Sequence, residues 1–275
     1  MVTRISLLVI VIILCSCAVL KKNPADGNPP GTVKINDTLY RDRTEVANVH
    51  WREYGFYLNG FDSANAYKAL PDTLVWKDSL FHNEPLVEYY FRHPGYNAYP
   101  AVGISYEQAV EFCKWRTFVV NLRLYMEKNN LKNHREHLND SFPIKVYYRL
   151  PTREEWEMIA AGKLPLQEFP YGYKDVYIDW KGKKRKLFNC VYPGDPPDTS
   201  RSSEKIYTMN VKSSFKNSFS IYNMIGNLAE MVSEKGTAKG GSFIHPLDSC
   251  KIQINQFYSE PQKWLGFRCV AVKLK

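Results

Sequence analysis

The sequence contains no internal repeat, and its N-terminal apolar run is too short to cross a membrane comfortably. The absence of a repeat argues against a solenoid or a propeller. The apolar run covers residues 5–14 and stops at small and polar residues, whereas a membrane-spanning helix needs roughly 20 apolar residues. We therefore expect the run to belong to a cleaved signal peptide, with an uncleaved anchor helix as the alternative.

The sequence also lacks a helix or strand on which basic residues cluster, as they do in proteins that bind nucleic acids. The formal net charge is +9, from 37 basic and 28 acidic residues, but the basic residues are scattered except in the run Lys181–Lys186. That run lies between "VYIDW" and "LFNCVY" and is predicted to be the exposed tip of a hairpin between two short strands. We therefore expect no nucleic-acid partner.

The composition that is present is that of a globular domain. The chain has 275 residues, of which 44% are hydrophobic and 24% are charged, enough to bury a sizeable core in one large domain. Helical patterns come early: residues 45–60 after Thr44 as a possible cap, a helix capped by Ser105, and another capped by Thr152 and ended by Gly162. Short strands and turns follow, which predicts the α+β class.

The segment that ends the apolar run, Leu14-Cys15-Ser16-Cys17, resembles the lipobox of bacterial lipoproteins. The resemblance implies that residues 1–16 are the signal peptide and that Cys17 becomes the lipidated first residue, so that a lipid anchors the chain to a membrane. Residues 17–38 are rich in Pro, Gly, Asn and Lys and are expected to be a flexible tether. Residues 39–275 are expected to form the domain.

Four cysteines remain beyond the signal region: Cys113, Cys190, Cys250 and Cys269. Disulfides are plausible in an oxidising envelope compartment. Four cysteines allow three pairings, and the spacing alone does not choose among them.

Seven motifs occur in the order found in the formylglycine-generating enzyme family, also called sulfatase-modifying factor domains. The motifs are "RTEVANVHWREY", "YPAVGISYEQAVEFCKWRT", "YRLPTREEWEMIAAG", "FPYGY", "IYNMIGNLAEMV", "KGGSF" and "LGFRCV". The resemblance implies a C-type-lectin-like fold with little regular secondary structure.

A longer segment that begins at "YYFRHPGYNAYP" is similar to gliding-motility lipoproteins of Bacteroidetes of the GldJ and GldK type. Those relatives imply a scaffold of the outer membrane linked to type IX secretion.

The family resemblance also implies sites for calcium and one disulfide. Calcium takes oxygen ligands, and the match places Asn223 and Glu230 as side-chain ligands, with carbonyls from Gly226 and Leu228. A second calcium site would begin at Asn189 and the carbonyl of Cys190, with Asp198 or Glu204 as a doubtful acidic partner. The resemblance pairs Cys113 with Cys269 and leaves Cys190 and Cys250 to pair with each other or to stay reduced.

In "KGGSFIHPLDSC", the resemblance places the family's catalytic site with one thiol replaced. Formylglycine formation uses copper between two thiolates, which suit soft Cu(I). Cys250 aligns with the second thiol, but His245 stands in the place of the first, while Ser242 is kept. We therefore do not expect copper at this degenerate site.

Three functions follow as hypotheses. The first is a non-catalytic, lipid-anchored protein of the cell envelope, specifically the outer membrane, that acts as a scaffold or interaction component of a gliding or type IX secretion type of assembly and has envelope proteins as partners. The second is a metal-dependent oxidase that uses His245 and Cys250. The third is a lectin-like module that binds a small ligand.

Overall fold

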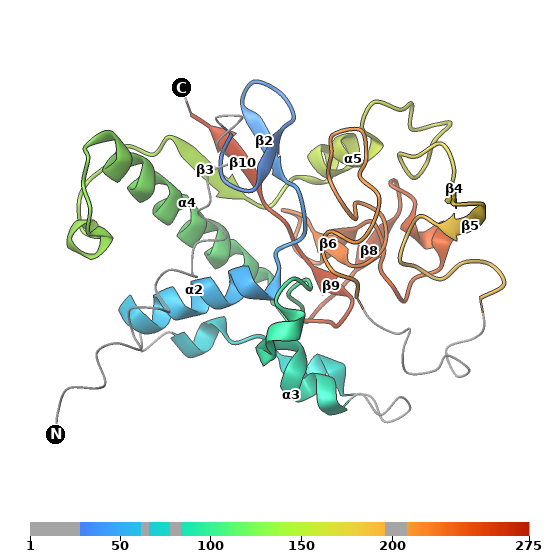
Figure 1. Ribbon diagram of the computed structural model, residues 1–275, viewed down its shortest axis with the longest axis horizontal. Coiled ribbons are helices and arrows are strands. Elements are labelled where there is room, and N and C mark those ends of the chain that lie inside the picture. The colour runs from blue at the N-terminus through green and yellow to red at the C-terminus, as the bar shows by residue number, and fades with distance from the viewer. Residues whose placement is uncertain (1–27, 62–65, 78–83, 196–207, 275) are drawn as a thin grey trace.

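Two four-stranded sheets, a separate hairpin and four α-helices build the part of the chain that the structure describes. The structure is a computed structural model that describes residues 28–61, 66–77, 84–195 and 208–274. The long helix α4 and helix α2 lie on one side in Figure 1, and the second sheet and the hairpin lie on the other. The α+β class predicted from the sequence is confirmed.

The first sheet has the strand order β1-β2-β10-β3, with antiparallel neighbours. Its strands are Thr32–Lys34 (β1), Leu39–Asp42 (β2), Val270–Lys273 (β10) and Val146–Arg149 (β3). Val33 pairs with Arg41 and is buried. The sheet therefore begins before Leu39, and the tether expected over residues 17–38 is too long at its C-terminal end, because residues 32–34 hydrogen-bond to β2. Residues 1–27 lie outside the described part.

The helices are α2 (Asn48–Phe61), α3 (Glu84–Arg92), α4 (Tyr106–Lys128) and α5 (Arg153–Ala161). Short 3-10 helices occupy Ala66–Ala69, Thr73–Trp76, Pro94–Tyr96, His134–His137 and Leu247–Cys250. Within the described residues, no helix has the length and apolarity to span a bilayer. Thr44 does not cap α2, since the helix begins four residues later, at Asn48, and the Thr44 hydroxyl donates to the Glu45 carbonyl instead.

The capping boxes predicted for α4 and α5 are confirmed. The Ser105 hydroxyl accepts from the backbone N–H of Gln108 at 3.1 Å, and the Gln108 side chain accepts from the Ser105 N–H at 2.8 Å. Thr152 and Glu155 make the same reciprocal pair, and Gly162 ends α5 with a positive φ of 64°. These local hydrogen bonds satisfy backbone N–H groups that a helix N-terminus leaves unpaired.

We expect Thr152→Ala to lower the free energy of unfolding by about 1 kcal/mol, because the N–H of Glu155 then loses its acceptor. Urea denaturation of the variant beside the wild type measures the loss. Thr38→Ala is the matched control, because Thr38 is exposed, and we expect it to change stability by less than about 0.5 kcal/mol. Equal effects of the two substitutions would contradict the cap assignment.

The second sheet has the order β8-β7-β6-β9. Its strands are Asn255–Phe257 (β8), Thr237–Lys239 (β7), Ala229–Met231 (β6) and Leu265–Gly266 (β9). Strands β6 and β9 are parallel and the other pairs are antiparallel. The candidate site residues lie in the segments that enter and leave β6 and β7.

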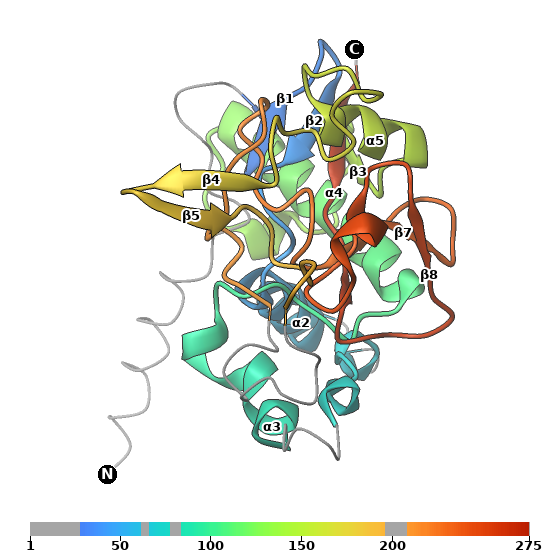
Figure 2. The ribbon, with the colours of Figure 1, turned by 90° about the vertical axis from the view of Figure 1, so that its right-hand side faces the viewer.

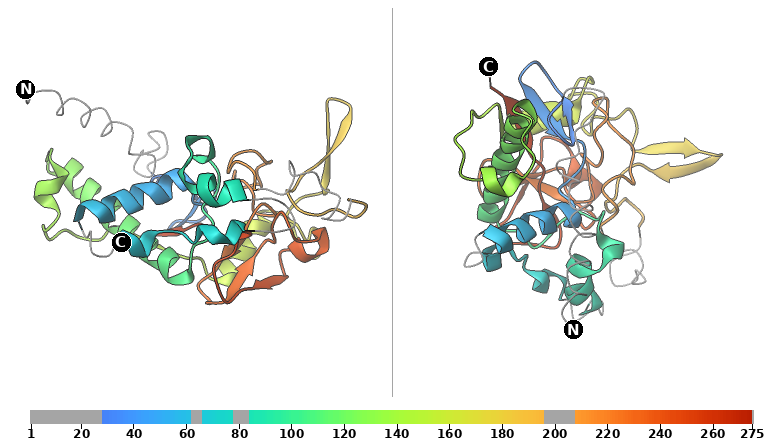
Figure 3. Two further views of the ribbon diagram at one scale, coloured as in Figure 1. Left: turned by 90° about the horizontal axis from the view of Figure 1, so that it is seen from below. Right: turned by 60° about the vertical axis from the view of Figure 1, so that its left-hand side comes forward.

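The basic run takes part in a protruding hairpin, but it is not only the tip. Strand β4 is Tyr177–Trp180 and strand β5 is Lys183–Lys186, so most of the run is the second strand. Lys181 and Gly182 make the turn with positive φ angles of 53° and 72°, the conformation that a two-residue hairpin needs. Figures 2 and 3 show the hairpin extending away from the body of the molecule. "LFNCVY", expected to be the second strand, follows the hairpin instead.

Two large apolar clusters form the core. In the first, Trp51 of α2 stacks on Phe112 of α4 at 5.5 Å between ring centroids, and Phe267 meets both rings edge-on. The second cluster gathers around Trp156 of α5 and contains Cys190 and Cys250. The second cluster therefore packs directly against the candidate site.

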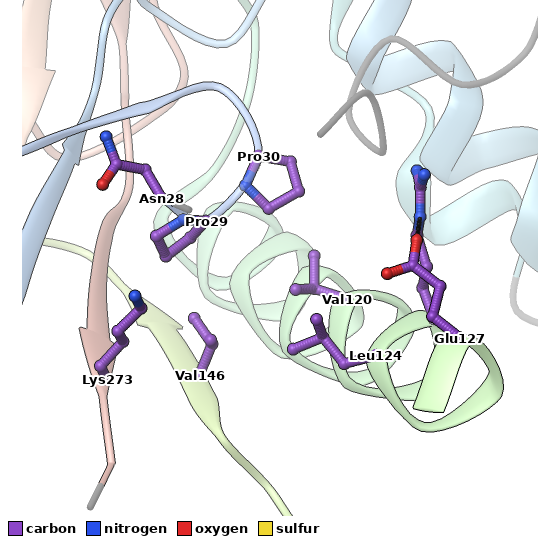
Figure 4. Close-up of a pocket in the computed structure, with 9 residues that line it drawn as sticks. Asn28, Pro29, Pro30, Val120, Leu124, Glu127, Val146 and Lys273 are labelled. Atoms are coloured by element: carbon purple, nitrogen blue, oxygen red, sulfur yellow. Dashed lines mark hydrogen bonds and ion pairs between the residues drawn. The ribbon is translucent and has the colours of Figure 1, made fainter. Parts of the chain in front are cut away.

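A cavity of about 80 Å³ lies where the described chain begins. The cavity is lined by Pro29 and Pro30, by Val120 and Leu124 of α4, and by Lys273 of β10 (Figure 4). Sites for drug-sized ligands measure about 300–1,000 Å³. This cavity is smaller than such a site.

Candidate functional site

The 239–250 loop, residues Lys239 to Cys250, runs from the end of β7 to the end of a 3-10 helix. It turns at Gly240 and Gly241, whose φ angles are 90° and 64°. A Cβ atom on Gly241 would lie 2.3 Å from the sulfur of Cys250. The glycine therefore lets the backbone pass directly over this thiol.

His245 is held by its neighbours within the molecule. Its Nδ1 and the hydroxyl of Ser242 are hydrogen-bonded at 2.7 Å, and its ring meets the Trp264 ring edge-on at 5.0 Å. Burial lowers the pKa of His245, which favours the neutral imidazole at pH 7.

Cys250 contacts a different set of groups. Its side chain is fully buried, and its thiol lies 3.4 Å from the carbonyl oxygen of Pro246, to which it donates. Its thiol also lies near that of Cys190, and this neighbouring thiol, together with burial, raises the pKa of Cys190. The imidazole of His245 and the thiol of Cys250 thus have separate partners, although the two residues lie in one loop.

A zinc site would need more ligands than His245 and Cys250 offer. Among the described residues, no group of three or more His, Cys, Asp or Glu side chains is placed to hold one. Structural zinc sites use four ligands and catalytic ones about three. Of these side-chain types, the described residues thus offer His245 and Cys250 no third ligand.

Glu230, predicted to be a calcium ligand, is instead the centre of a buried ion network. Its Oε2 accepts from Nη2 of Arg41 at 2.6 Å and from Nε1 of Trp156 at 2.8 Å. Its Oε1 accepts from Nε of Arg268 at 2.7 Å. All these side chains are buried. Two guanidinium groups already compensate this carboxylate and would repel a cation, so Glu230 does not fit a calcium site.

Asn223, the other predicted side-chain ligand of calcium, is hydrogen-bonded next to the Glu230 network through its amide. Its Nδ2 donates to Oε2 of Glu45 at 3.1 Å, and Nδ2 of Asn227 donates to Oε1 of Glu45 at 2.7 Å. Arg268 lies 3.8 Å from the same carboxylate. Sequence reasoning missed Glu45, Asn227 and both arginines. The available signal was an arginine beside apolar residues, as in "LYRD" and "GFRCV".

The remaining calcium candidates lie together. A parallel bridge joins Asn189 to Gly226, and the carbonyl oxygen of Asn189 accepts from the N–H of Asn227 at 2.8 Å. The N–H of Gly226 donates to Gly240, and Leu228 is buried beside them. The structure therefore brings both predicted calcium segments together, but through backbone and amide hydrogen bonds. Asp198 and Glu204 lie outside the described residues, and a second calcium site that begins at Asn189 and the carbonyl of Cys190 stays a prediction.

Cys113 and Cys269, paired by the family resemblance, do lie together. Their sulfur atoms are 3.4 Å apart in the first core cluster. Beside them, Oδ2 of Asp42 accepts from Arg116 at 2.7 Å and from the N–H of Cys269 at 2.8 Å. The proximity supports the predicted pair. The lipidation residue Cys17 lies outside the described residues.

Glu45 should make stability depend on pH. Burial raises its pKa from 4.5 to about 7, so the folded state binds the proton more tightly than the unfolded state. Stability from this group is then full below about pH 4.5 and falls as pH rises toward 7, by on the order of 3 kcal/mol. Urea unfolding of the wild type and of Glu45→Gln, each at pH 5 and at pH 8, measures this loss. Between pH 5 and pH 8, the free energy of unfolding should fall more in the wild type than in the variant. A difference that is equal at both pH values would contradict this prediction.

The solved structures that are similar to the chain include three distant ones. CarF has 16% identity and a TM-score of 0.46, with 89% of this chain and 96% of that chain covered. PvdO from Pseudomonas aeruginosa has 18% identity and a TM-score of 0.48, with 86% and 80% covered. Treponema denticola variable protein 1 has 16% identity and a TM-score of 0.45, with 89% and 91% covered.

Sequence comparison gives a curated relative and a family. Chaperone protein LppX of Paenibacillus barcinonensis is 25% identical over 177 residues, which are 56% of this chain and 62% of that protein. The match thus spans less than two thirds of the relative. The model of the sulfatase-modifying factor enzyme 1-like domain matches residues 14–273. The predicted family and its mixed α+β fold are confirmed, and the chain belongs to the sulfatase-modifying factor, or formylglycine-generating enzyme, family.

Proposed function

We propose that this chain is a non-catalytic, lipid-anchored protein of the cell envelope whose domain binds other envelope proteins. The state of the 239–250 loop carries the proposal. One of the family's two thiol positions holds His245, whose Nδ1 bonds to Ser242, and the remaining thiol of Cys250 is fully buried against Cys190. An open pair of thiolates for Cu(I) is therefore not assembled.

Two further observations support a binding role. The lipobox-like segment ending at Cys17 would tether the domain to a membrane. The relative from Paenibacillus barcinonensis is named a chaperone protein, and this name agrees with binding to other proteins. The resemblance around "YYFRHPGYNAYP" extends the proposal to a scaffold in an outer-membrane assembly of the gliding or type IX secretion type.

Cross-linking and capture of the full chain from intact envelopes tests this function. We expect the wild type and His245→Ala to capture the same envelope proteins, because the imidazole is partly buried and is held by Ser242 and Trp264. We expect Cys17→Ala to leave the membrane fraction. The matched assay on the purified domain measures Cu(I) binding and oxygen uptake with a cysteine substrate. Stoichiometric copper binding with oxygen uptake that His245→Ala abolishes would overturn the proposal in favour of an oxidase.

A further inference from the structure

All four cysteines beyond the N-terminal region lie in two contacting pairs. Cys113 and Cys269 have sulfur atoms 3.4 Å apart, and Cys190 and Cys250 lie in the same buried cluster, where each is near the other's thiol. All four side chains are buried. The family resemblance implies the first pair, whereas only the tertiary structure brings the second together.

Backbone hydrogen bonds fix the two segments that carry the second pair. Val191, next to Cys190, donates its N–H to the carbonyl of His245 at 3.0 Å and accepts from the N–H of Leu247 at 2.8 Å. These bonds form a parallel bridge between Val191 and Pro246. Main-chain pairing one residue after Cys190 and four residues before Cys250 therefore holds the two segments side by side.

The surroundings of this pair suit a disulfide better than two thiolates. Cys250 is 0% exposed and Cys190 is 8% exposed, and both belong to the apolar cluster around Trp156. Burial in apolar surroundings disfavours a charged thiolate, which metal binding would require. A disulfide carries no charge and keeps both sulfur atoms in the core.

We propose that Cys190 and Cys250 form an intramolecular disulfide in the exported protein, so that the last sulfur of the degenerate catalytic site is covalently closed. Two S–H bonds break and one S–S bond forms. The two electrons and two protons pass to a disulfide of a thiol–disulfide oxidoreductase, which becomes a dithiol. The proposal rests on the export part of the proposed function, because such oxidants act in the envelope.

The burial of both sulfurs dictates when the bond forms. A protein oxidant cannot reach Cys250 in the folded domain, so oxidation takes place during folding, before the 239–250 loop closes over the thiol. The bond links two segments across a chain stretch of about 60 residues. For the same reason, a reductant should open it only after the domain unfolds.

Thiol mapping of the full chain isolated from envelopes tests the bond. The protein is unfolded at neutral pH in an excess of alkylating reagent and without reduction, then reduced and alkylated with a second reagent, and each cysteine peptide is read separately by mass spectrometry. We expect the second label at Cys190 and Cys250, and a linked peptide of the two in the unreduced digest. The first label at both positions, or a link from either to another cysteine, would overturn the proposal.

Single variants separate a bond from simple packing. Cys190→Ala should change Cys250 from fully protected to fully alkylated by the first reagent, with Cys113 and Cys269 unchanged. Cys113→Ala is the matched control and should expose Cys269 while Cys250 stays protected. If Cys250 takes the first label equally in the wild type and Cys190→Ala, the thiols only pack together. The mapping is independent of partner capture, so a chain with the bond intact but without partners would sink only the proposed function.

Discussion

Glu230→Gln is expected to destabilise the domain by about 3–5 kcal/mol. In the wild type, both oxygens of Glu230 accept from the guanidinium groups of Arg41 and Arg268, and all three side chains are fully buried. The amide would offer a single acceptor oxygen, and its NH₂ group would face a donor. Two buried positive charges would then lose their main compensation. Thermal and urea denaturation measure the loss.

Glu260→Gln is the matched control, because Glu260 is exposed and its replacement should change stability by less than about 0.5 kcal/mol. A second experiment tests whether Glu230 binds calcium. Since Glu230 serves two arginines, a calcium chelator should not lower the melting temperature through this residue. A chelator effect that is present in the wild type and absent in Glu230→Gln would show that the carboxylate binds calcium after all.

Loss of the bridge between Cys113 and Cys269 is the second large expected effect. The two positions are 156 residues apart in the chain, and their sulfur atoms lie 3.4 Å from each other. In the chain-entropy model, a bridge across such a loop stabilises the fold by about 5 kcal/mol, because it restricts the unfolded chain. We expect the double variant Cys113→Ala/Cys269→Ala to lose most of this stability in urea unfolding without reductant.

The loss of sulfur packing must be separated from the loss of the bond. The double variant is therefore compared with the wild type after reduction in the unfolded state, which keeps the sulfur atoms but removes the bridges. If oxidised and reduced wild type have the same midpoint, the covalent bond contributes nothing. The double variant Cys190→Ala/Cys250→Ala is measured in the same way. It keeps only the Cys113–Cys269 pair, so an effect of reduction on its midpoint comes from that bridge.

Local features could be predicted from the sequence because their partners lie a few residues away. Ser105 and Thr152 cap their helices through residues three positions later. The exposed basic hairpin was also predicted, but its strands were shifted, because the turn at Lys181 and Gly182 depends on two positive φ angles that charge patterning does not reveal. The error at Thr44 has a similar origin: tertiary contacts of Asn48 with Tyr90 and Tyr96 fix where α2 begins.

The sequence by itself determined the family and the α+β class. Only the tertiary structure decided what the candidate site residues do. Arg41 meets Glu230 across 189 positions, and Glu45 meets Asn227 across 182. The sequence does not distinguish a carboxylate that binds a cation from one that pairs with a basic side chain. Only the fold shows which charges lie next to it. Here two buried arginines face Glu230, and a second thiol faces Cys250.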